Sequence, residues 1–176
     1  MITRATLPAL FLLASATASL AGQDKHHAGT DVSNHIGFER FKLLAGDWVG
    51  KEQGKDGQEV HVTYKVTSGG SAVVETIFPG TEHEMVTVIH RDGADLLLTH
   101  YCMLGNQPQM RASGKGDSNK VEFKFVRATN LMSEKDMHMH NVTFTFEGKD
   151  TLRSEWTNYN DGKAAGQVVL ELRRKK

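Results

Sequence analysis

The sequence predicts an all-β protein, an antiparallel up-and-down β-barrel of about ten strands with a short N-terminal helix capping one end. Three observations predict this fold. Apolar and polar residues alternate along most of the chain after residue 45, which is the period of a strand with one buried face. Turn signals that contain glycine separate these stretches at short intervals. The expected hairpins follow one another without a long crossover, which favours a barrel over a sandwich.

A short helix is expected first, over residues 36–44. Phe38, Phe41 and Leu44 recur three residues apart and fall on one face of such a helix, and Asn34 can cap its start. This apolar face predicts that the helix packs onto the barrel.

The expected strands follow the helix at even spacing. The alternation predicts inward-facing side chains at every second residue, for example at Val60, Val62 and Tyr64. Only residues 129–137 interrupt the pattern, and neither a second domain nor a repeat is visible. The strands are expected near residues 47–53, 59–67, 71–78, 83–91, 95–103, 108–114, 120–128, 138–147, 151–159 and 166–174.

Composition is typical of one globular domain. The chain has 176 residues, of which 39% are hydrophobic and 24% are charged. Lys and Arg total 21, and Asp and Glu also total 21, so the formal net charge is zero. Because this balance gives no attraction to phosphate groups, we expect no nucleic-acid partner.

The N-terminal residues have the pattern of a secretory signal peptide over residues 1–21. Arg4 precedes a strongly apolar stretch, and a small-x-small pattern allows cleavage after Ala21. We therefore expect an exported protein, periplasmic or secreted. Residues 22–35 are polar and are predicted to be a flexible lead-in to a barrel domain over residues 36–176.

Cys102 is the single cysteine of the chain. It lies far from the expected cleavage site, so lipidation at that site is not expected, and one cysteine forms no internal disulfide. The apolar centre of the N-terminal segment is also shorter than the ~20 residues of a spanning helix. We therefore expect no membrane anchor, and we interpret Cys102 as an inert, buried thiol because no basic neighbour lowers its pKa.

The helix runs directly into the motif Gly46-x-Trp48. This arrangement resembles the opening of calycin barrels, the lipocalin and fatty-acid-binding superfamily. The resemblance implies that Gly46 and Trp48 are structural residues, and that Trp48 closes the barrel floor against a basic residue from the end of the barrel. Arg173 is the expected partner, with Arg174 as the alternative.

A closer resemblance covers roughly residues 40–174. The chain is similar to a family of small exported bacterial proteins known as domain of unknown function 1579, which implies no particular activity. The segments that carry this resemblance are residues 70–76, 83–88, 99–102 and 105–108, Met137-His138-Met139-His140 and the strand of Trp156.

Heme-binding barrels of the nitrobindin type open with Gly-x-Trp-x-Gly-x-Gly. This chain has Gly46, Trp48 and Gly50, but Glu52 stands at the last position. A heme or a metal ion is therefore an open alternative as a cofactor rather than the leading expectation.

His138 and His140 are the most distinctive candidate site residues. They share strand parity with Val142, Phe144 and Phe146, which predicts that both rings face the barrel interior. Neighbouring imidazoles can contact a ligand, share a metal ion or form a structural hydrogen-bonded pair. Soft ligands from Met137 and Met139 would favour copper(I) only if residues 132–140 form a loop.

Other residues are expected to complete an interior ligand site. His100 shares a face with Leu96 and Leu98 and is a candidate third ligand for the histidine pair. Glu75 and Glu84 are candidate buried carboxylates, with Arg111 or Arg127 as the expected partner. The apolar walls of the site are expected from Tyr64, Phe123, Phe125, Phe144 and Trp156.

These observations predict a non-enzymatic barrel that binds a small, partly apolar ligand in its interior. The chain contains no nucleophile elbow, phosphate loop or HExxH motif. The alternative is a metal- or heme-binding barrel that uses His138 and His140. Residues 83–91 are apolar on both faces, which leaves a homodimer as an expectation for the outer face.

Overall fold

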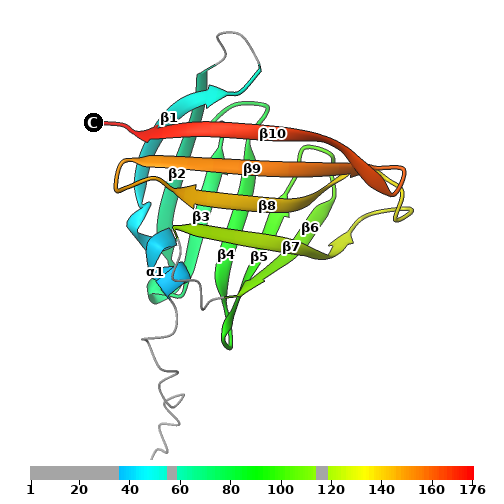
Figure 1. Cartoon of the computed structure of the whole chain (residues 1–176), viewed down its shortest axis with the longest axis horizontal. Coiled ribbons are helices and arrows are strands. Elements are labelled where there is room, and N and C mark those ends of the chain that lie inside the picture. Colours follow the sequence, from blue (N-terminus) through cyan, green and yellow to red (C-terminus); the bar gives the residue numbers. More distant parts are fainter. Residues whose placement is uncertain (1–35, 55–58, 114–118) are drawn as a thin grey trace, which may run out of the picture.

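A computed structural model describes residues 36–54, 59–113 and 119–176. The expected signal peptide and lead-in lie outside these residues. The helix α1 (Ile36–Leu43) is followed by ten antiparallel strands that form a closed barrel (Figure 1). The strands are β1 (Gly46–Glu52), β2 (Glu59–Thr67), β3 (Ala72–Ile77), β4 (Met85–Asp92), β5 (Asp95–Tyr101), β6 (Gln107–Ser113), β7 (Lys120–Thr129), β8 (His138–Phe146), β9 (Thr151–Asn160) and β10 (Lys163–Arg174).

The topology confirms the predicted up-and-down barrel. Each strand pairs with the next one along the chain, and β1 pairs with β10 to close the sheet. The last strand begins earlier than expected, at Lys163 rather than near residue 166. The hairpin from β9 extends to this point because a bulge between Ala164 and Gly166 keeps the two strands paired. None of the helices in the described part of the chain combines the length and the hydrophobicity that a membrane crossing requires.

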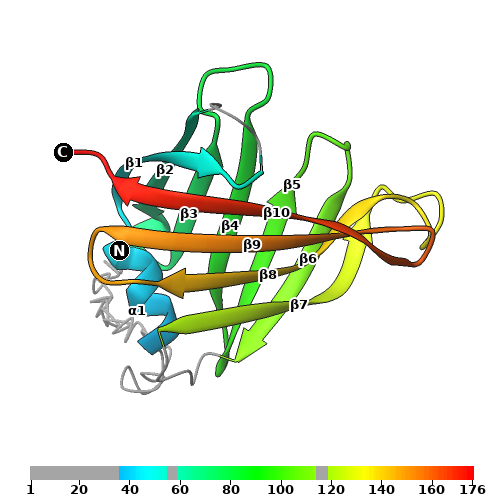
Figure 2. The same ribbon diagram turned by 45° about the horizontal axis from the view of Figure 1, so that its top comes forward.

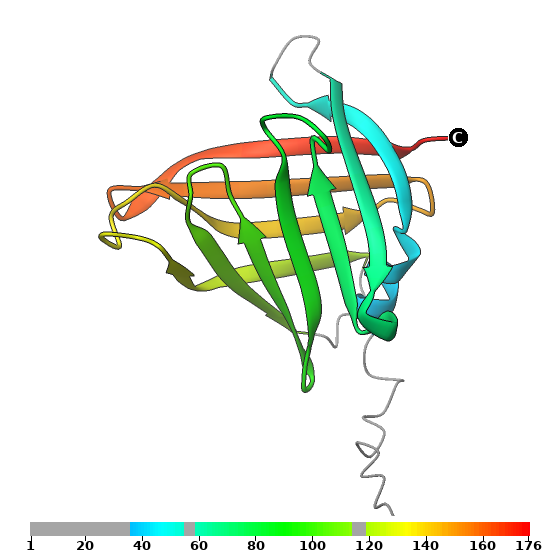
Figure 3. The ribbon, with the colours of Figure 1, turned by 180° about the vertical axis from the view of Figure 1, so that it is seen from behind.

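The barrel has two walls whose strands cross at a steep angle. Strands β7–β10 form one wall in Figure 1, and strands β2–β6 form the opposite wall, which faces the viewer in Figure 3. Side chains from the two walls can therefore meet across the interior.

The helix α1 closes one end of the barrel, as predicted (Figure 2). Phe38 and Phe41 are buried. The ring of Phe41 packs edge-on against Phe144, with centroids 5.1 Å apart, and also contacts Phe123 at 5.9 Å. Aromatic pairs of this geometry add to the stabilisation from buried area, so this end of the interior is filled core.

Arg174, and not the expected Arg173, lies over the ring of Trp48. The guanidinium carbon of Arg174 is 4.5 Å from the ring centroid. Its Nη1 and Nη2 donate hydrogen bonds to the carbonyls of Ala45 (2.8 Å) and Leu43 (2.7 Å). Arg174 therefore satisfies carbonyl groups at the C-terminus of α1 while it covers the indole.

Gly50 marks the closest approach of β1 to β10. A Cβ atom on this residue would lie 1.8 Å from the carbonyl oxygen of Glu171. The pairing of Gly50 with Leu172 therefore needs a residue without a side chain.

Candidate functional site

Four buried polar residues form a row across adjacent strands of one wall. Tyr64 on β2 pairs with Glu75 on β3, Glu75 pairs with Thr87 on β4, and Thr87 pairs with His100 on β5. All four side chains are at most 3% exposed. We call Tyr64, Glu75, Thr87 and His100 the polar row.

Hydrogen bonds connect the polar row from end to end. The Tyr64 hydroxyl donates to Oε1 of Glu75 at 2.5 Å. Thr87 also hydrogen-bonds to Glu75, and its Oγ1 lies 3.0 Å from Nδ1 of His100. Registered pairing on one face of a sheet brings these groups within reach of one another.

Burial shifts the titration of three members of the polar row. Burial raises the pKa of Glu75 despite its hydrogen bonds from Tyr64 and Thr87. Burial and the neighbouring carboxyl of Glu75 raise the pKa of Tyr64, so the phenol stays neutral. Burial lowers the pKa of His100 to about 4, which leaves its imidazole uncharged at neutral pH.

A cavity of about 360 Å³ lies at the end of the barrel opposite α1. His100 and Trp156 supply its buried polar groups, and Glu52 and His83 lie on its lining as well. The other lining residues are apolar: Ile77, Phe78, Met85, Met103, Met139, Val168 and Leu170. This volume and lining are typical of a site for a small organic ligand.

Trp156 faces His100 across the barrel. The ring centroids are 4.7 Å apart, although β9 and β5 belong to opposite walls. Nε1 of Trp156 is buried and has no hydrogen-bond partner among the described residues. Trp156 lines the cavity and carries a buried indole donor that lacks an acceptor among the described residues, and such a group favours a ligand or water oxygen.

Further polar atoms without partners lie along the same strand. Oγ of Ser154 and Oδ1 of Asn158 are buried on β9 and lack hydrogen-bond partners in the described part of the chain. On β3, Oε2 of Glu75 is buried and lacks a partner in the same way. Ser154, Trp156 and Asn158 alternate along β9 and share one face of it. The interior thus offers more hydrogen-bonding capacity than the described protein groups use.

His138 and His140 do not face this cavity, and the predicted shared face with Val142 is wrong. A bulge between Met139 and Asn141 inserts one extra residue into β8. The insertion reverses the alternation, so Met139 lines the cavity while the two histidines line another hollow. His100 is therefore not a third ligand for the pair.

The second hollow, of about 800 Å³, lies between β7, the start of β8 and residues 131–135. We call it the loop-side hollow. The ring of His140 is stacked between Tyr159, at a centroid distance of 3.6 Å, and Phe125, at 4.4 Å. Nε2 of His138 lies 3.0 Å from Nδ1 of His140, while Nδ1 of His138 is 2.7 Å from the carbonyl oxygen of Asp136.

These contacts give the histidine pair a packing role. Burial and, secondarily, the proximity of His138 lower the pKa of His140. Among the described residues, no group of three or more His, Cys, Asp or Glu side chains could hold a metal ion. The pair alone offers two nitrogen donors, whereas zinc sites use three or four ligands.

Heme also fits the described residues poorly. In the cavity, His100 is the buried histidine, and its ring packs against Trp156 while Thr87 holds its Nδ1. A cavity of about 360 Å³ is at the small end of ligand pockets. These residues fit a smaller organic molecule better than a porphyrin.

The predicted wall residues divide among four places. Trp156 lines the cavity, and Tyr64 lies behind it in the polar row. Phe123 and Phe144 pack under α1 in the filled end of the barrel, and Phe125 lines the loop-side hollow. The structure thus brings together only part of the predicted set.

The carboxylates also differ from expectation. Glu75 is buried, as predicted, but its partners are Tyr64 and Thr87 rather than an arginine. Arg111 instead pairs with Asp92 at 2.7 Å. Glu84 is exposed and accepts a hydrogen bond from the backbone of Gly80 at 2.6 Å.

Sequence reasoning missed Thr87, although a signal for it exists. Thr87 shares strand parity with Met85 and Ile89 in an apolar stretch, so its hydroxyl had to face inward and find a partner. Ser154 carries the same signal between Leu152 and Trp156.

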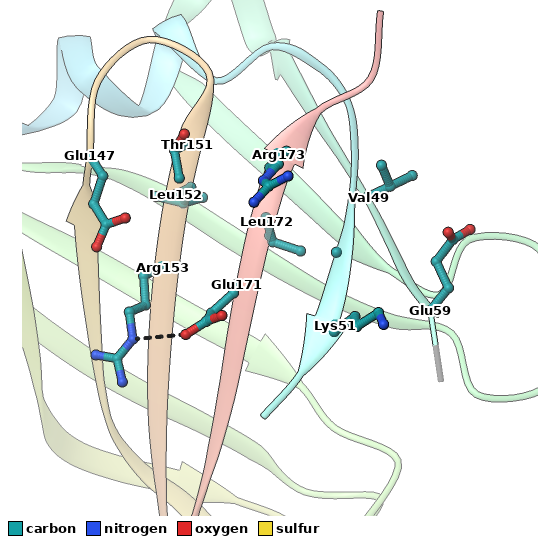
Figure 4. A pocket seen from close by; sticks show the side chains of 11 residues that line it. Val49, Lys51, Glu59, Glu147, Thr151, Leu152, Arg153, Glu171, Leu172 and Arg173 are labelled. Carbon is teal, nitrogen blue, oxygen red and sulfur yellow. Dashed lines mark ion pairs between the residues drawn. The ribbon is translucent and has the colours of Figure 1, made fainter. Parts of the chain in front are cut away.

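A third hollow, of about 500 Å³, lies on the outside of β1, β9 and β10 (Figure 4). Its charged side chains are Lys51, Arg153 and Arg173, balanced by Glu59, Glu147 and Glu171. Arg153 and Glu171 approach each other at 3.9 Å. Because three positive charges face three negative ones, the described lining of this hollow has no net charge to select an ion.

The described residues form a closed, ten-stranded antiparallel barrel with a filled end under α1 and a cavity of about 360 Å³ at the other end. No family model matches the chain, and no curated protein matches it either. Among solved structures, the chain is similar to a protein of unknown function of the DUF3598 family from Nostoc punctiforme. That likeness has a TM-score of 0.50 and 11% identity, and it covers 77% of this chain and 49% of the other. The chain thus spans about half the length of that protein, and the likeness shows the barrel fold alone.

Proposed function

We propose that the protein binds a small, largely apolar molecule in the cavity beside His100 and Trp156. The observation that carries this proposal is the combination of a mostly apolar lining with two buried residues that carry polar ring nitrogens, His100 and Trp156. Apolar walls supply affinity in such sites, and a few polar groups orient the ligand.

The lining favours binding over covalent catalysis. Its described residues include no Ser, Thr, Cys or Lys, the side chains that most often act as nucleophiles. Cys102 lies next to the end of β5, and burial raises the pKa of its thiol, which lowers its reactivity.

The proposal includes a calycin-like assignment and export. The short helix, Gly46-x-Trp48 and the cover of Trp48 by Arg174 support a calycin-like barrel. The sequence pattern of residues 1–21 supports export to the periplasm or medium. The half-buried outer residues Val86 and Val88 of β4 are where a homodimer would form.

A matched pair of valine substitutions tests the cavity. Val168 lines the cavity, and Val49 lines the outer hollow on another strand. Titration calorimetry with 1-decanol and with decanoate should detect binding of at least one of them to the wild-type protein. Val168→Phe fills the cavity and should weaken that binding at least tenfold, whereas Val49→Phe should leave it unchanged.

Thermal denaturation of both variants checks that they are folded. Absence of binding by both decyl probes would overturn the proposal. Equal binding by a folded Val168→Phe variant would overturn it as well, because the probe would then occupy another site.

A further inference from the structure

We propose that the cavity selects a neutral ligand with a hydroxyl group at its buried end and discriminates against a carboxylate of the same length. This inference deepens the proposed function and rests on it. It follows from the charges around the cavity and from the hydrogen-bonding groups that the cavity presents.

The described cavity lining contains no positive counter-charge. Its titratable residues are Glu52, His83 and His100, and no Lys or Arg is among the described lining residues. His83 is half-exposed at the rim and lies 3.7 Å from Glu82. A carboxylate that enters this cavity loses its hydration and gains no compensating charge from the described lining residues.

The polar row also disfavours an anion. Burial keeps the imidazole of His100 neutral at and above neutral pH, since it lowers the pKa of that ring to about 4. If the carboxyl of Glu75 is ionised, it repels a carboxylate, and if it is protonated, it supplies no attraction. Both states of Glu75 therefore favour an uncharged head group.

The available hydrogen-bonding groups favour a hydroxyl. Nε1 of Trp156 can only donate, and it has no acceptor among the described residues. Thr87 holds Nδ1 of His100, which leaves Nε2 as the other ring nitrogen of this cavity-lining residue. When the Thr87 hydroxyl donates to Glu75, Nδ1–H of His100 donates to Thr87, and Nε2 becomes an acceptor.

A hydroxyl group suits this pair of partners because it donates and accepts at once. Its proton can bond to Nε2 of His100 while its oxygen accepts from Nε1 of Trp156. A ketone could only accept, which would leave the acceptor of His100 unsatisfied. An alkane would leave both groups unsatisfied.

Calorimetric titration with decyl probes at pH 8 tests the inference. We expect 1-decanol to bind at least tenfold more tightly than decanoate and at least threefold more tightly than 2-decanone. The substitution His100→Phe keeps a ring against Trp156 but removes the acceptor. It should remove the preference for 1-decanol over 2-decanone and leave the affinity for 2-decanone within twofold.

The outcomes separate this inference from the proposed function. Binding of decanoate as tight as that of 1-decanol would overturn the inference and leave the cavity as the binding site. An unchanged preference for 1-decanol in folded His100→Phe would overturn the role of His100. Absence of binding by every decyl probe would overturn the proposed function itself. If the His100→Phe variant does not fold, the comparison of the decyl probes on the wild-type protein still tests the inference.

Discussion

The imidazole of His100 lies against the indole of Trp156, with ring centroids 4.7 Å apart and the ring planes inclined by 45°. The two residues come from strands β5 and β9 of opposite walls, so this contact spans the barrel. On one side lies the core packed under α1, and on the other lies the cavity. The same pair of rings therefore joins the walls and forms the inner surface of the candidate site.

His100 should make the stability of the protein depend on pH below neutrality. Its pKa is about 4 in the folded protein and 6.5 ordinarily, so the folded state resists protonation. Its stabilising contribution is present above pH 6.5 and is lost as the pH falls toward 4, by roughly 3 kcal/mol. Urea denaturation at pH 7 and pH 4.5 should show a smaller loss for His100→Phe than for the wild-type protein. Equal losses in His100→Phe and in the wild-type protein would contradict the prediction.

Glu75 should produce a pH dependence of the opposite sign. Burial raises its pKa above the ordinary 4.5, so its contribution is present below that pH and is lost as the pH rises through the raised value. Glu75→Gln keeps the shape and stays neutral. The free energy of unfolding of the variant, relative to wild type, should therefore increase from pH 5 to pH 9. A constant difference between Glu75→Gln and the wild-type protein over this range would refute the assignment.

Arg174 should stabilise the closed end of the barrel, whereas Arg173 should not. Arg174→Ala removes the contact with Trp48 and two hydrogen bonds to carbonyls beside α1. The expected cost is about 2 kcal/mol of unfolding free energy. Arg173→Ala is the matched control because it removes the same charge from an exposed neighbour, and it should cost no more than about 0.5 kcal/mol. Chemical denaturation checks both, and equal effects would show that the position over Trp48 is unimportant.

Gly50→Ala should be much more harmful than Gly166→Ala. The new Cβ at Gly50 would meet the carbonyl oxygen of Glu171 at 1.8 Å, so β1 and β10 must separate. A loss of about 3 kcal/mol or more is expected. At Gly166, also in a strand, the nearest atom is a side-chain atom of Asn158 at 3.5 Å, and the cost should be below about 1 kcal/mol. Comparable stabilities of the two variants would contradict the close approach of the strands.

A substitution in the histidine pair should lower stability, whereas a substitution of its neighbour Met139 should change ligand affinity. His138→Ala removes contacts to His140 and Asp136 and should lower the unfolding free energy by about 1–3 kcal/mol. Because the pair lines the loop-side hollow, the affinity for 1-decanol should stay within twofold. Met139→Ala alters the cavity wall and should change that affinity more. Calorimetry on both folded variants checks this, and a large loss of affinity in His138→Ala would place the pair at the binding site.

The sequence predicted the barrel because the alternation of apolar and polar residues is visible along each single strand. Val60, Val62 and Tyr64 are buried as their parity indicates, because a strand with one wet face needs an apolar residue at every second position. The turns between strands have local signals as well, since positive φ favours glycine, as at Gly93 and Gly162. Strand number, order and closure followed from these local rules.

The sequence also predicted the buried members of the site, but not their partners. The inward parity of His100 and Trp156 is visible along each strand, and Glu75 was a candidate buried carboxylate. Their contacts depend on which strands face each other across the interior. Residues more than fifty positions apart, such as His100 and Trp156, carry no local signal of that contact.

Only the tertiary structure decided the faces of His138 and His140. A strand has a period of two, so one extra residue in the bulge between Met139 and Asn141 moves every earlier side chain of β8 to the other face. That bulge depends on pairing with β9, and β7 is paired with β8 only from Lys120 to Phe123. The alternation of the sequence thus determined the barrel, while long-range pairing determined which histidine reaches the cavity, because register is a property of two strands together.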